Sequence, residues 1–239
     1  MSGLVRHRHP GRRALRIAAP ILVLLGLSGT LAVALQVREV KVTGVVRFSA
    51  REVETVLRSA LGTPTIVTRA ERLRTAVLAI PWVAEATVKV SLDGVVSCTV
   101  SERQPAAFTR DGGELQLIDG QGNVLGPYGA DLGLLRLDGF APFPDERTHA
   151  LAGLRPCELA WGGRVERIER LGPHDVALHF AGGGPSVLAD PASPAALAIG
   201  REVLAAWPTT RLGAARQIDV RVPGRVAVLP AALPVAEAS

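Results

Sequence analysis

Few residues in this chain have the types and spacing that chemistry requires. His174 and His179 have neither a cysteine pair nor a carboxylate at ligand spacing, so they do not predict a metal site. Residues 181–185 are glycine-rich, but the Gly-Lys-Ser/Thr sequence of a phosphate-binding loop does not follow them. No serine stands in the Gly-x-Ser-x-Gly arrangement of a hydrolase nucleophile. The patterns therefore predict a protein that is not an enzyme and that holds no cofactor or metal.

The two cysteines give no stronger signal. Cys98 alternates with Val96 and Val100, as a buried strand residue does. A bridge from Cys98 to Cys157 would join two different predicted modules, so the sequence favours two buried free thiols over a disulfide.

The charge distribution argues against nucleic acid as a partner. The chain has 27 Lys and Arg residues against 22 Asp and Glu, and its excess charge is +5. Five arginines account for that excess, and all of them lie in the first sixteen residues: Arg6, Arg8, Arg12, Arg13 and Arg16. Nucleic-acid binding needs basic residues spread over a folded face, and the rest of the chain is neutral overall.

An uncharged segment follows the basic tail. Residues 17–35 read IAAPILVLLGLSGTLAVAL, and a helix of this length spans about 28 Å at about 1.5 Å per residue. The segment predicts a single transmembrane helix, and the arginines before it predict that residues 1–16 stay in the cytoplasm. About two hundred residues then lie on the outer side of the membrane.

A cleaved signal peptide is the alternative reading of the same segment. Ala32, Val33 and Ala34 have the small-x-small form of a cleavage site after Ala34. The apolar run is longer than the usual 7 to 15 residues of a signal peptide, which favours a retained helix. Both readings export the same folded part.

The first exported region predicts a β-α-α-β-β unit. Residues 37–42 alternate as a strand does, and two amphipathic helices follow, each opened by a predicted capping box, Ser49 with Glu52 and Thr68 with Glu71. Residues 88–92 and 96–100 then form a hairpin across Asp93 and Gly94. A three-stranded sheet with both helices on one face is expected, because a hairpin alone cannot bury its apolar side.

The second region predicts a mixed sheet with flanking helices. Helices are expected at residues 146–161, with a weak point at Pro156, and from Ser193 to Pro208. The last hairpin is expected at residues 216–222 and 225–229, and residues 231–239 are expected to form a disordered tail. The other strands are expected at residues 106–109, 114–119, 123–125, 134–137, 164–171, 175–180 and 186–189.

The order of these segments resembles a known family. The stretches VREVKVTG, IPWVAEATVKV and VSERQPAA resemble a POTRA domain, and more closely the POTRA domain of the FtsQ/DivIB family of bacterial cell-division proteins. The segments ELQLIDGQGNVL and QIDVRVPGRVAV are similar to later parts of that family. The resemblance implies an α+β chain with a membrane helix at 17–35, a POTRA domain at 37–104 and a β domain at 105–230.

The resemblance also implies a function without catalysis. It describes a single-pass scaffold of the divisome at the septum, which binds FtsB/DivIC-like and FtsL-like proteins and other divisome membrane proteins. The end of the β domain would pair with a strand of the partner, and an edge strand has the free backbone groups for such pairing. The implied contact residues are Arg221, Val222, Arg225, Val226, Ala227 and Val228. Many relatives have an aromatic residue where Val222 stands here.

Two other functions fit the sequence less well. An exported POTRA-type chaperone or translocation component would bind extended polypeptides along a strand edge, but it would predict several POTRA repeats or a following barrel. A secreted enzyme would need a polar cleft that the sequence does not indicate.

Overall fold

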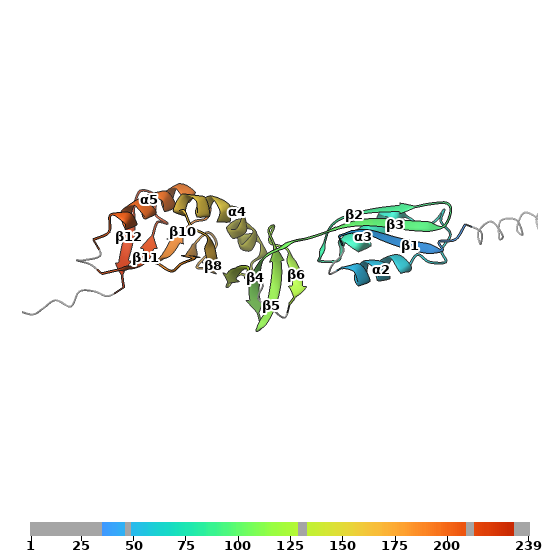
Figure 1. Ribbon diagram of the computed structural model, residues 1–239, viewed down its shortest axis with the longest axis horizontal. Coiled ribbons are helices and arrows are strands. Elements are labelled where there is room, and N and C mark those ends of the chain that lie inside the picture. The colour runs from blue at the N-terminus through green and yellow to red at the C-terminus, as the bar shows by residue number, and fades with distance from the viewer. Residues whose placement is uncertain (1–34, 46–48, 129–132, 209–212, 232–239) are drawn as a thin grey trace, which may run out of the picture. The chain divides into compact units, whose positions relative to one another are not determined.

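The computed structural model describes residues 35–45, 49–128, 133–208 and 213–231 (Figure 1). The chain divides into two compact units between Glu102 and Arg103. The predicted tail at 1–16, all but Ala231 of the predicted tail at 231–239, and all but Leu35 of the predicted membrane helix lie outside the described residues. Within the described ranges, no helix has the length and apolar character needed to cross a bilayer.

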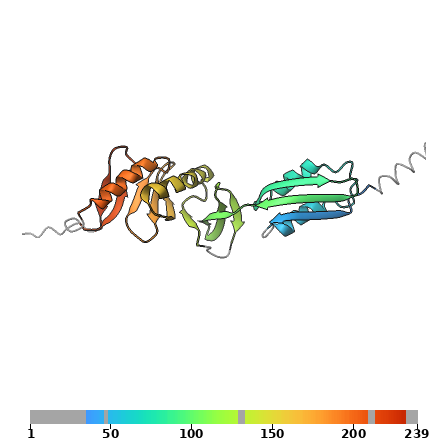
Figure 2. The same ribbon diagram turned by 45° about the horizontal axis from the view of Figure 1, so that its top comes forward.

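The first unit is a three-stranded sheet with two helices. Its elements are β1 (Glu39–Val45), α2 (Ala50–Arg58), α3 (Ala70–Leu78), β2 (Val83–Val90) and β3 (Val95–Glu102). The strand order is β1-β3-β2, with β1 parallel to β3 and β2 antiparallel to it. Figure 2 shows this sheet in front of its helices. The β-α-α-β-β order predicted from the sequence is confirmed.

The helices of the first unit bury their apolar stripes against the sheet. Val53 and Leu57 of α2 are fully buried, as is Val77 of α3. They join a core that also holds Val37, Ala60, Leu73, Ile80, Val83, Ala86, Val88, Val96, Cys98 and Val100. Each fully buried aliphatic side chain contributes about 1.5–3 kcal/mol, so the core stabilises the small sheet.

The two predicted capping boxes are wrong. Ser49 precedes α2, but its hydroxyl and its backbone N–H both donate to Oε1 of Glu102, each at 2.7 Å. The N-cap of α3 is Arg69, and the Thr68 hydroxyl donates to the Pro64 carbonyl at 2.9 Å. The Ser49 hydroxyl therefore bonds a carboxylate that is distant in the sequence, and the Thr68 hydroxyl bonds a carbonyl of its own loop. Neither hydroxyl caps the helix end for which the sequence pattern predicted it.

The second unit is built around one nine-stranded sheet. Its elements are β4 (Pro105–Asp111), β5 (Glu114–Asp119), β6 (Val124–Pro127), β7 (Leu135–Asp138), α4 (Pro144–Trp161), β8 (Val165–Arg170), β9 (Val176–Phe180), β10 (Ser186–Ala189), α5 (Pro194–Ala205), β11 (Ala215–Asp219) and β12 (Ala227–Pro230). The strand order is β12-β11-β10-β9-β8-β7-β4-β5-β6. The predicted mixed α+β fold is confirmed, and α4 continues through Pro156 to Trp161.

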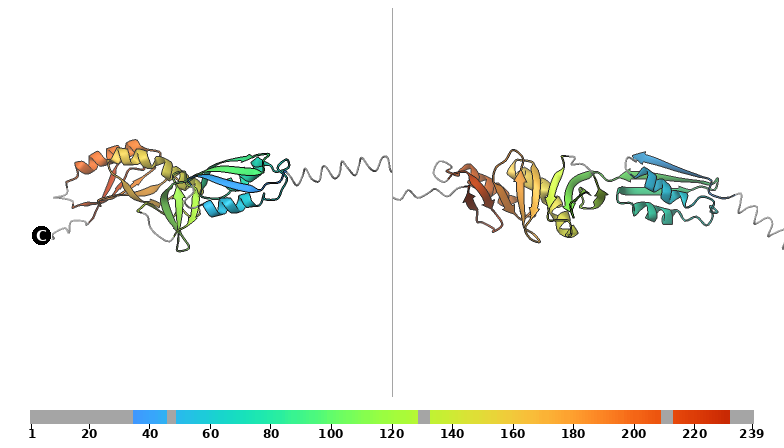
Figure 3. Two further views of the ribbon diagram at one scale, coloured as in Figure 1. Left: turned by 45° about the vertical axis from the view of Figure 1, so that its right-hand side comes forward. Right: turned by 90° about the horizontal axis from the view of Figure 1, so that it is seen from below.

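Both helices of the second unit lie along one face of the sheet. Helix α4 contacts α5 and β8, and α5 contacts β10 and β11 (Figure 3). Helix α5 packs closely on the end of β11 because Gly200 has no side chain there: a Cβ atom at this position would lie 2.7 Å from Cγ1 of Val220, the residue that follows β11. The core between the layers includes Leu137, Ile168, Leu178, Val187, Leu197 and Ile218.

Asp119 organises the turn between β5 and β6. Its carboxylate accepts the backbone N–H groups of Gln121 and Asn123, the side-chain amide of Asn123 and Nη1 of Arg103. Buried Arg147 of α4 donates through Nε to the Gly122 carbonyl at 2.8 Å, so the helix holds the same turn. The turn is therefore fixed from two sides.

Candidate protein-binding edge

The last strand of the chain forms one edge of the nine-stranded sheet. Strand β12 pairs with β11 in an antiparallel ladder, and no strand in the described part of the chain lies on its other side (Figure 1). An edge strand offers backbone N–H and C=O groups to another chain. The predicted edge position of the last strand is thus present in the structure.

The register shows which backbone groups of β12 face outward. The Ala231 N–H donates to the Ala214 carbonyl at 2.7 Å, and Ala227 is paired with Asp219 and Leu229 with Gln217. Because N–H directions alternate along a strand, Ala227, Leu229 and Ala231 point toward β11, whereas Val228 and Pro230 point away. Proline has no N–H, so Val228 supplies the outward N–H of β12, flanked by its own carbonyl and that of Pro230.

The side chains of β12 divide between the two faces of the sheet. Val228 and the preceding Val226 pack against the core of the second unit. Leu229 is on the opposite face and is 51% exposed, and Ala227 is exposed as well. The edge is therefore apolar on both faces, which suits a partner strand with alternating apolar side chains.

The turn between the two last strands is longer than the sequence predicted. Strand β11 ends at Asp219 and β12 begins at Ala227, so Arg225 and Val226, which were expected on the final strand, precede it. The Arg225 N–H donates to the Val222 carbonyl at 3.1 Å, which closes a turn at Pro223 and Gly224. The Val220 N–H meanwhile donates to Leu188 of β10. These bonds take residues 220–225 out of the ladder with β12.

Arg221 is held in an ion-pair cluster beside the edge. Its guanidinium donates to both carboxylate oxygens of Asp219, at 3.0 and 2.7 Å, and to Oδ2 of Asp175 at 3.2 Å. The hydrogen bond from Arg221 outweighs partial burial and holds the pKa of Asp219 below its ordinary value. The same bond raises the pKa of Arg221. Two carboxylates therefore hold one guanidinium, and the cluster fixes the Arg221 side chain next to the strand edge.

The structure adds residues that the sequence did not single out. Asp175 lies directly before β9, far from Arg221 in the sequence, and no local pattern connects the two. Ile199 of α5, 48% exposed, lines a shallow apolar depression with Val222 and Val226 beside the turn. Val222 itself is 55% exposed. The six predicted contact residues thus gather along one edge, from the turn to the middle of β12.

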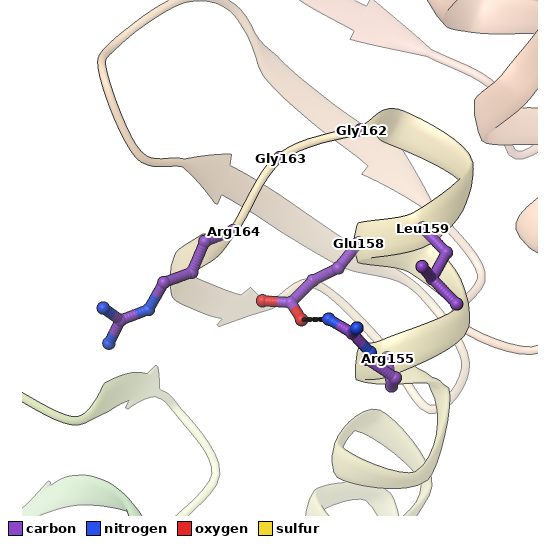
Figure 4. Close-up of a pocket in the computed structure, with 6 residues that line it drawn as sticks. All are labelled: Arg155, Glu158, Leu159, Gly162, Gly163 and Arg164. Carbon is purple, nitrogen blue, oxygen red and sulfur yellow. Dashed lines mark ion pairs between the residues drawn. The ribbon is translucent and has the colours of Figure 1, made fainter.

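A larger hollow at the end of α4 has no chemistry of its own. It encloses about 450 Å³ and is lined by Arg155, Glu158, Leu159, Gly162, Gly163 and Arg164 (Figure 4). Glu158 pairs with Arg155 at 3.5 Å and accepts the Val165 N–H at 3.0 Å. Arg164 donates to the Gly133 carbonyl at 3.1 Å. Glu158 therefore links α4 to β8, Arg155 pairs with Glu158 within α4, and Arg164 contacts the loop at Gly133.

The histidines outside the tail contact charged or aromatic neighbours. His149 lies 3.4 Å from Asp190, with its ring 5.8 Å from that of His174. Burial and then the Arg167 cation lower the pKa of His179. No group of three metal-ligating side chains occurs among the described residues.

Both cysteines are buried free thiols, as the sequence favoured. Burial raises the pKa of Cys98, and burial with the nearby Asp190 and Glu158 carboxylates raises the pKa of Cys157 to about 11. A thiol with such a pKa is protonated at neutral pH and is a poor nucleophile.

Comparison with known proteins identifies the first unit. Residues 35–103 match the family model of the POTRA domain, FtsQ-type. No curated protein matches the chain. A solved structure of the major extracytoplasmic domain of the cell-division protein DivIB from Geobacillus stearothermophilus matches with 20% identity and a TM-score of 0.32, over 44% of this chain and 93% of that one. The predicted FtsQ-type POTRA domain is therefore confirmed for residues 35–103.

Proposed function

From the FtsQ-type POTRA domain at residues 35–103, we propose that the protein is a non-enzymatic cell-division scaffold anchored in the cytoplasmic membrane by residues 17–35. Its partners are FtsB/DivIC-like and FtsL-like proteins and other membrane proteins of the divisome at the septum. The observation that carries the binding mechanism is the edge position of β12.

Binding proceeds by addition of a partner strand to β12. The Val228 N–H and the carbonyls of Val228 and Pro230 supply backbone hydrogen bonds. Leu229 and Val222 supply apolar contact, and Arg221 stays paired with Asp219 and Asp175 beside the edge. The departure at Val222, where relatives often have an aromatic residue, changes the side-chain contact but not the backbone pairing.

Membrane anchoring makes a modest edge-strand affinity sufficient. A single backbone hydrogen bond contributes only about 0.5–1.5 kcal/mol net. Two proteins anchored in one membrane plane meet at a raised effective concentration, so a short strand is enough to hold them together. The proposed scaffold therefore needs both the anchor and the edge.

A matched pair of variants at Val228 tests the strand addition. Val228→Pro removes the outward N–H, and Val228→Ala keeps that N–H while removing the same packing against the core. The β11 ladder does not use this N–H, and Pro230 already occupies the next outward position. In detergent, the proline variant should bind the FtsB-like partner roughly 5- to 150-fold more weakly than the alanine variant.

The readout is co-purification of the full chain with FtsB-like and FtsL-like proteins from its own host, followed by affinity measurement. Amide hydrogen exchange at Gln217 and Asp219 checks that β11 and β12 remain paired in both variants. Equal binding by folded proline and alanine variants would move the interface away from β12. Failure of the unaltered protein to bind these partners, with capture of extended polypeptides instead, would support the chaperone alternative.

A further inference from the structure

The exposed apolar side chains of the first unit gather at one end. Among its described residues, four large hydrophobic side chains are exposed: Leu61 (43%), Ile66 (71%), Val67 (66%) and Leu92 (69%). The first three lie in the loop between α2 and α3, and Leu92 lies in the turn between β2 and β3. These two loops are named the apolar end of the unit.

Hydrogen bonds tie the apolar end to the first described residues of the chain. The Thr65 N–H donates to the Leu35 carbonyl at 2.7 Å, and Val37 exchanges backbone bonds with Gly62 and Thr63, each at 2.9 Å. The Arg38 N–H donates to the Gly94 carbonyl at 2.8 Å. Both loops therefore lie beside the point where residues 17–35 join the folded unit.

The position of Leu35 determines how far these loops lie from a membrane. Our proposed function makes residues 17–35 a transmembrane helix, so Leu35 lies at the outer surface of the bilayer. Thr65 is within hydrogen-bond distance of Leu35, and Ile66 follows it directly in the chain. Consecutive Cα atoms are about 3.8 Å apart, so Ile66 lies within about 10 Å of Leu35 and thus near the bilayer surface.

We propose that the apolar end is a lipid-contact surface, with Ile66, Val67 and Leu92 inserted into the membrane interface. This inference rests on the membrane anchoring in the proposed function. Apolar side chains next to the bilayer gain by leaving water for the boundary between headgroups and acyl chains. Insertion of two loops beside the helix fixes the tilt of the POTRA unit on the membrane. The covalent connection at Leu35 alone would not fix that tilt.

The charges beside the apolar end fit an anionic lipid surface. Exposed Arg69 and Arg72 line the same depression as Val67 between α2 and α3. Cationic side chains this close to the bilayer surface are attracted by anionic lipid headgroups. Asp93 is the acidic residue next to Leu92, and its carboxylate accepts the Val95 N–H at 3.3 Å, so part of its hydrogen-bonding capacity is already used.

Spin labels on the full chain in vesicles of phosphatidylcholine and phosphatidylglycerol test the proposal. Labels are placed at Ile66→Cys and Leu92→Cys, with Ser101→Cys, exposed at the opposite end of β3, as the matched control. A label at Leu25→Cys reports on the anchor itself. Cys98 and Cys157 are fully buried and stay unlabelled.

The reagent that collides more often with the label should differ between the two ends of the unit. Labels at positions 66 and 92 should collide more with oxygen, which concentrates in lipid, than with a water-soluble nickel chelate, and the label at position 101 should do the opposite. Water-exposed labels at 66 and 92 with a lipid-exposed label at 25 would overturn the lipid contact and leave the anchor intact. Labels at 66 and 92 shielded from both reagents would show a protein partner instead. A water-exposed label at 25 would overturn the anchor, and the inference with it.

Discussion

At the start of α2, one buried carboxylate oxygen of Glu102 accepts two hydrogen bonds from Ser49. Ser49→Ala removes the hydroxyl donor and should lower the free energy of unfolding of the first unit by about 1–3 kcal/mol, because the oxygen stays buried with one donor fewer. Glu52→Ala is the matched control and should change it by less than about 0.5 kcal/mol, since Glu52 is exposed. Urea unfolding measures both values. Equal losses in the two variants would mean that the capping box forms after all.

Asp119 should make the stability of the second unit depend on pH. Burial by itself would raise the pKa of Asp119, but hydrogen bonds from Asn123, Arg103 and Gln121 outweigh it and hold that pKa below its ordinary value. A pKa lowered by folding gives stability that is complete above the unfolded value, about 3.9, and is lost as pH falls through the folded value.

The comparison of wild type with Asp119→Asn isolates this contribution from the other carboxylates. Between pH 6 and 2, the free energy of unfolding of the variant should fall less steeply below about pH 4 than that of the wild type. At pH 7 the variant should be less stable, since it loses the ion pair with Arg103. Denaturant unfolding across the pH range measures both effects. Parallel pH curves for the two proteins would contradict the assigned role of Asp119.

At the scale of elements, Gly200 sets the distance between α5 and β11. Gly200→Ala gains about 1 kcal/mol of helix propensity, but its Cβ would lie 2.7 Å from the buried Val220 side chain. Overpacking of this kind costs about 1–3 kcal/mol, so we expect a net loss of stability in the second unit. Val220→Ala should cost less in the Gly200→Ala background than alone, as a double-mutant cycle of thermal unfolding measures. Independent effects of the two substitutions would contradict the close contact.

The elements were predictable wherever local patterns determine them. The strict alternation of β2 and β3 around Asp93 and Gly94, and the apolar stripes of α2 and α3, were visible in the sequence because each element buries one face. The bounds of β12 were not, because they depend on the turn bond from Arg225 to Val222 and on the pairing of Val220 with β10. Alternation alone does not show which residues leave a ladder.

At the scale of the whole molecule, contacts between distant segments escaped the sequence. The parallel pairing of β4 with β7, the contact of Ser49 with Glu102 and that of Arg221 with Asp175 all join residues far apart in the chain. The sequence predicted an edge position for the last strand only if that strand is the terminal strand of its sheet. The strand order shows that it is, so residues 227–230 form an open edge.

The orientation of the whole chain should depend on its basic tail. Replacement of Arg6, Arg8, Arg12, Arg13 and Arg16 by asparagine removes the excess positive charge that, in the proposed topology, holds the N-terminus in the cytoplasm. The fraction of molecules that export a C-terminal alkaline phosphatase fusion should therefore fall. Replacement of the distant exposed arginines Arg155, Arg201 and Arg216 should leave export unchanged, since charges far from the membrane segment have little influence on orientation.

The mass of the exported protein separates the two readings of residues 17–35. A retained helix gives the full-length mass, and cleavage after Ala34 gives a chain that begins at Leu35. The folded first unit should tolerate either product, because a chain that begins at Leu35 keeps every contact that the structure describes for this unit, including that of the Leu35 carbonyl. The proposed scaffold function would not, because a cleaved chain would lose the raised effective concentration on which a short edge strand depends. Full-length mass with export that depends on the tail arginines is the expected outcome, and the cleaved mass would contradict the membrane anchor.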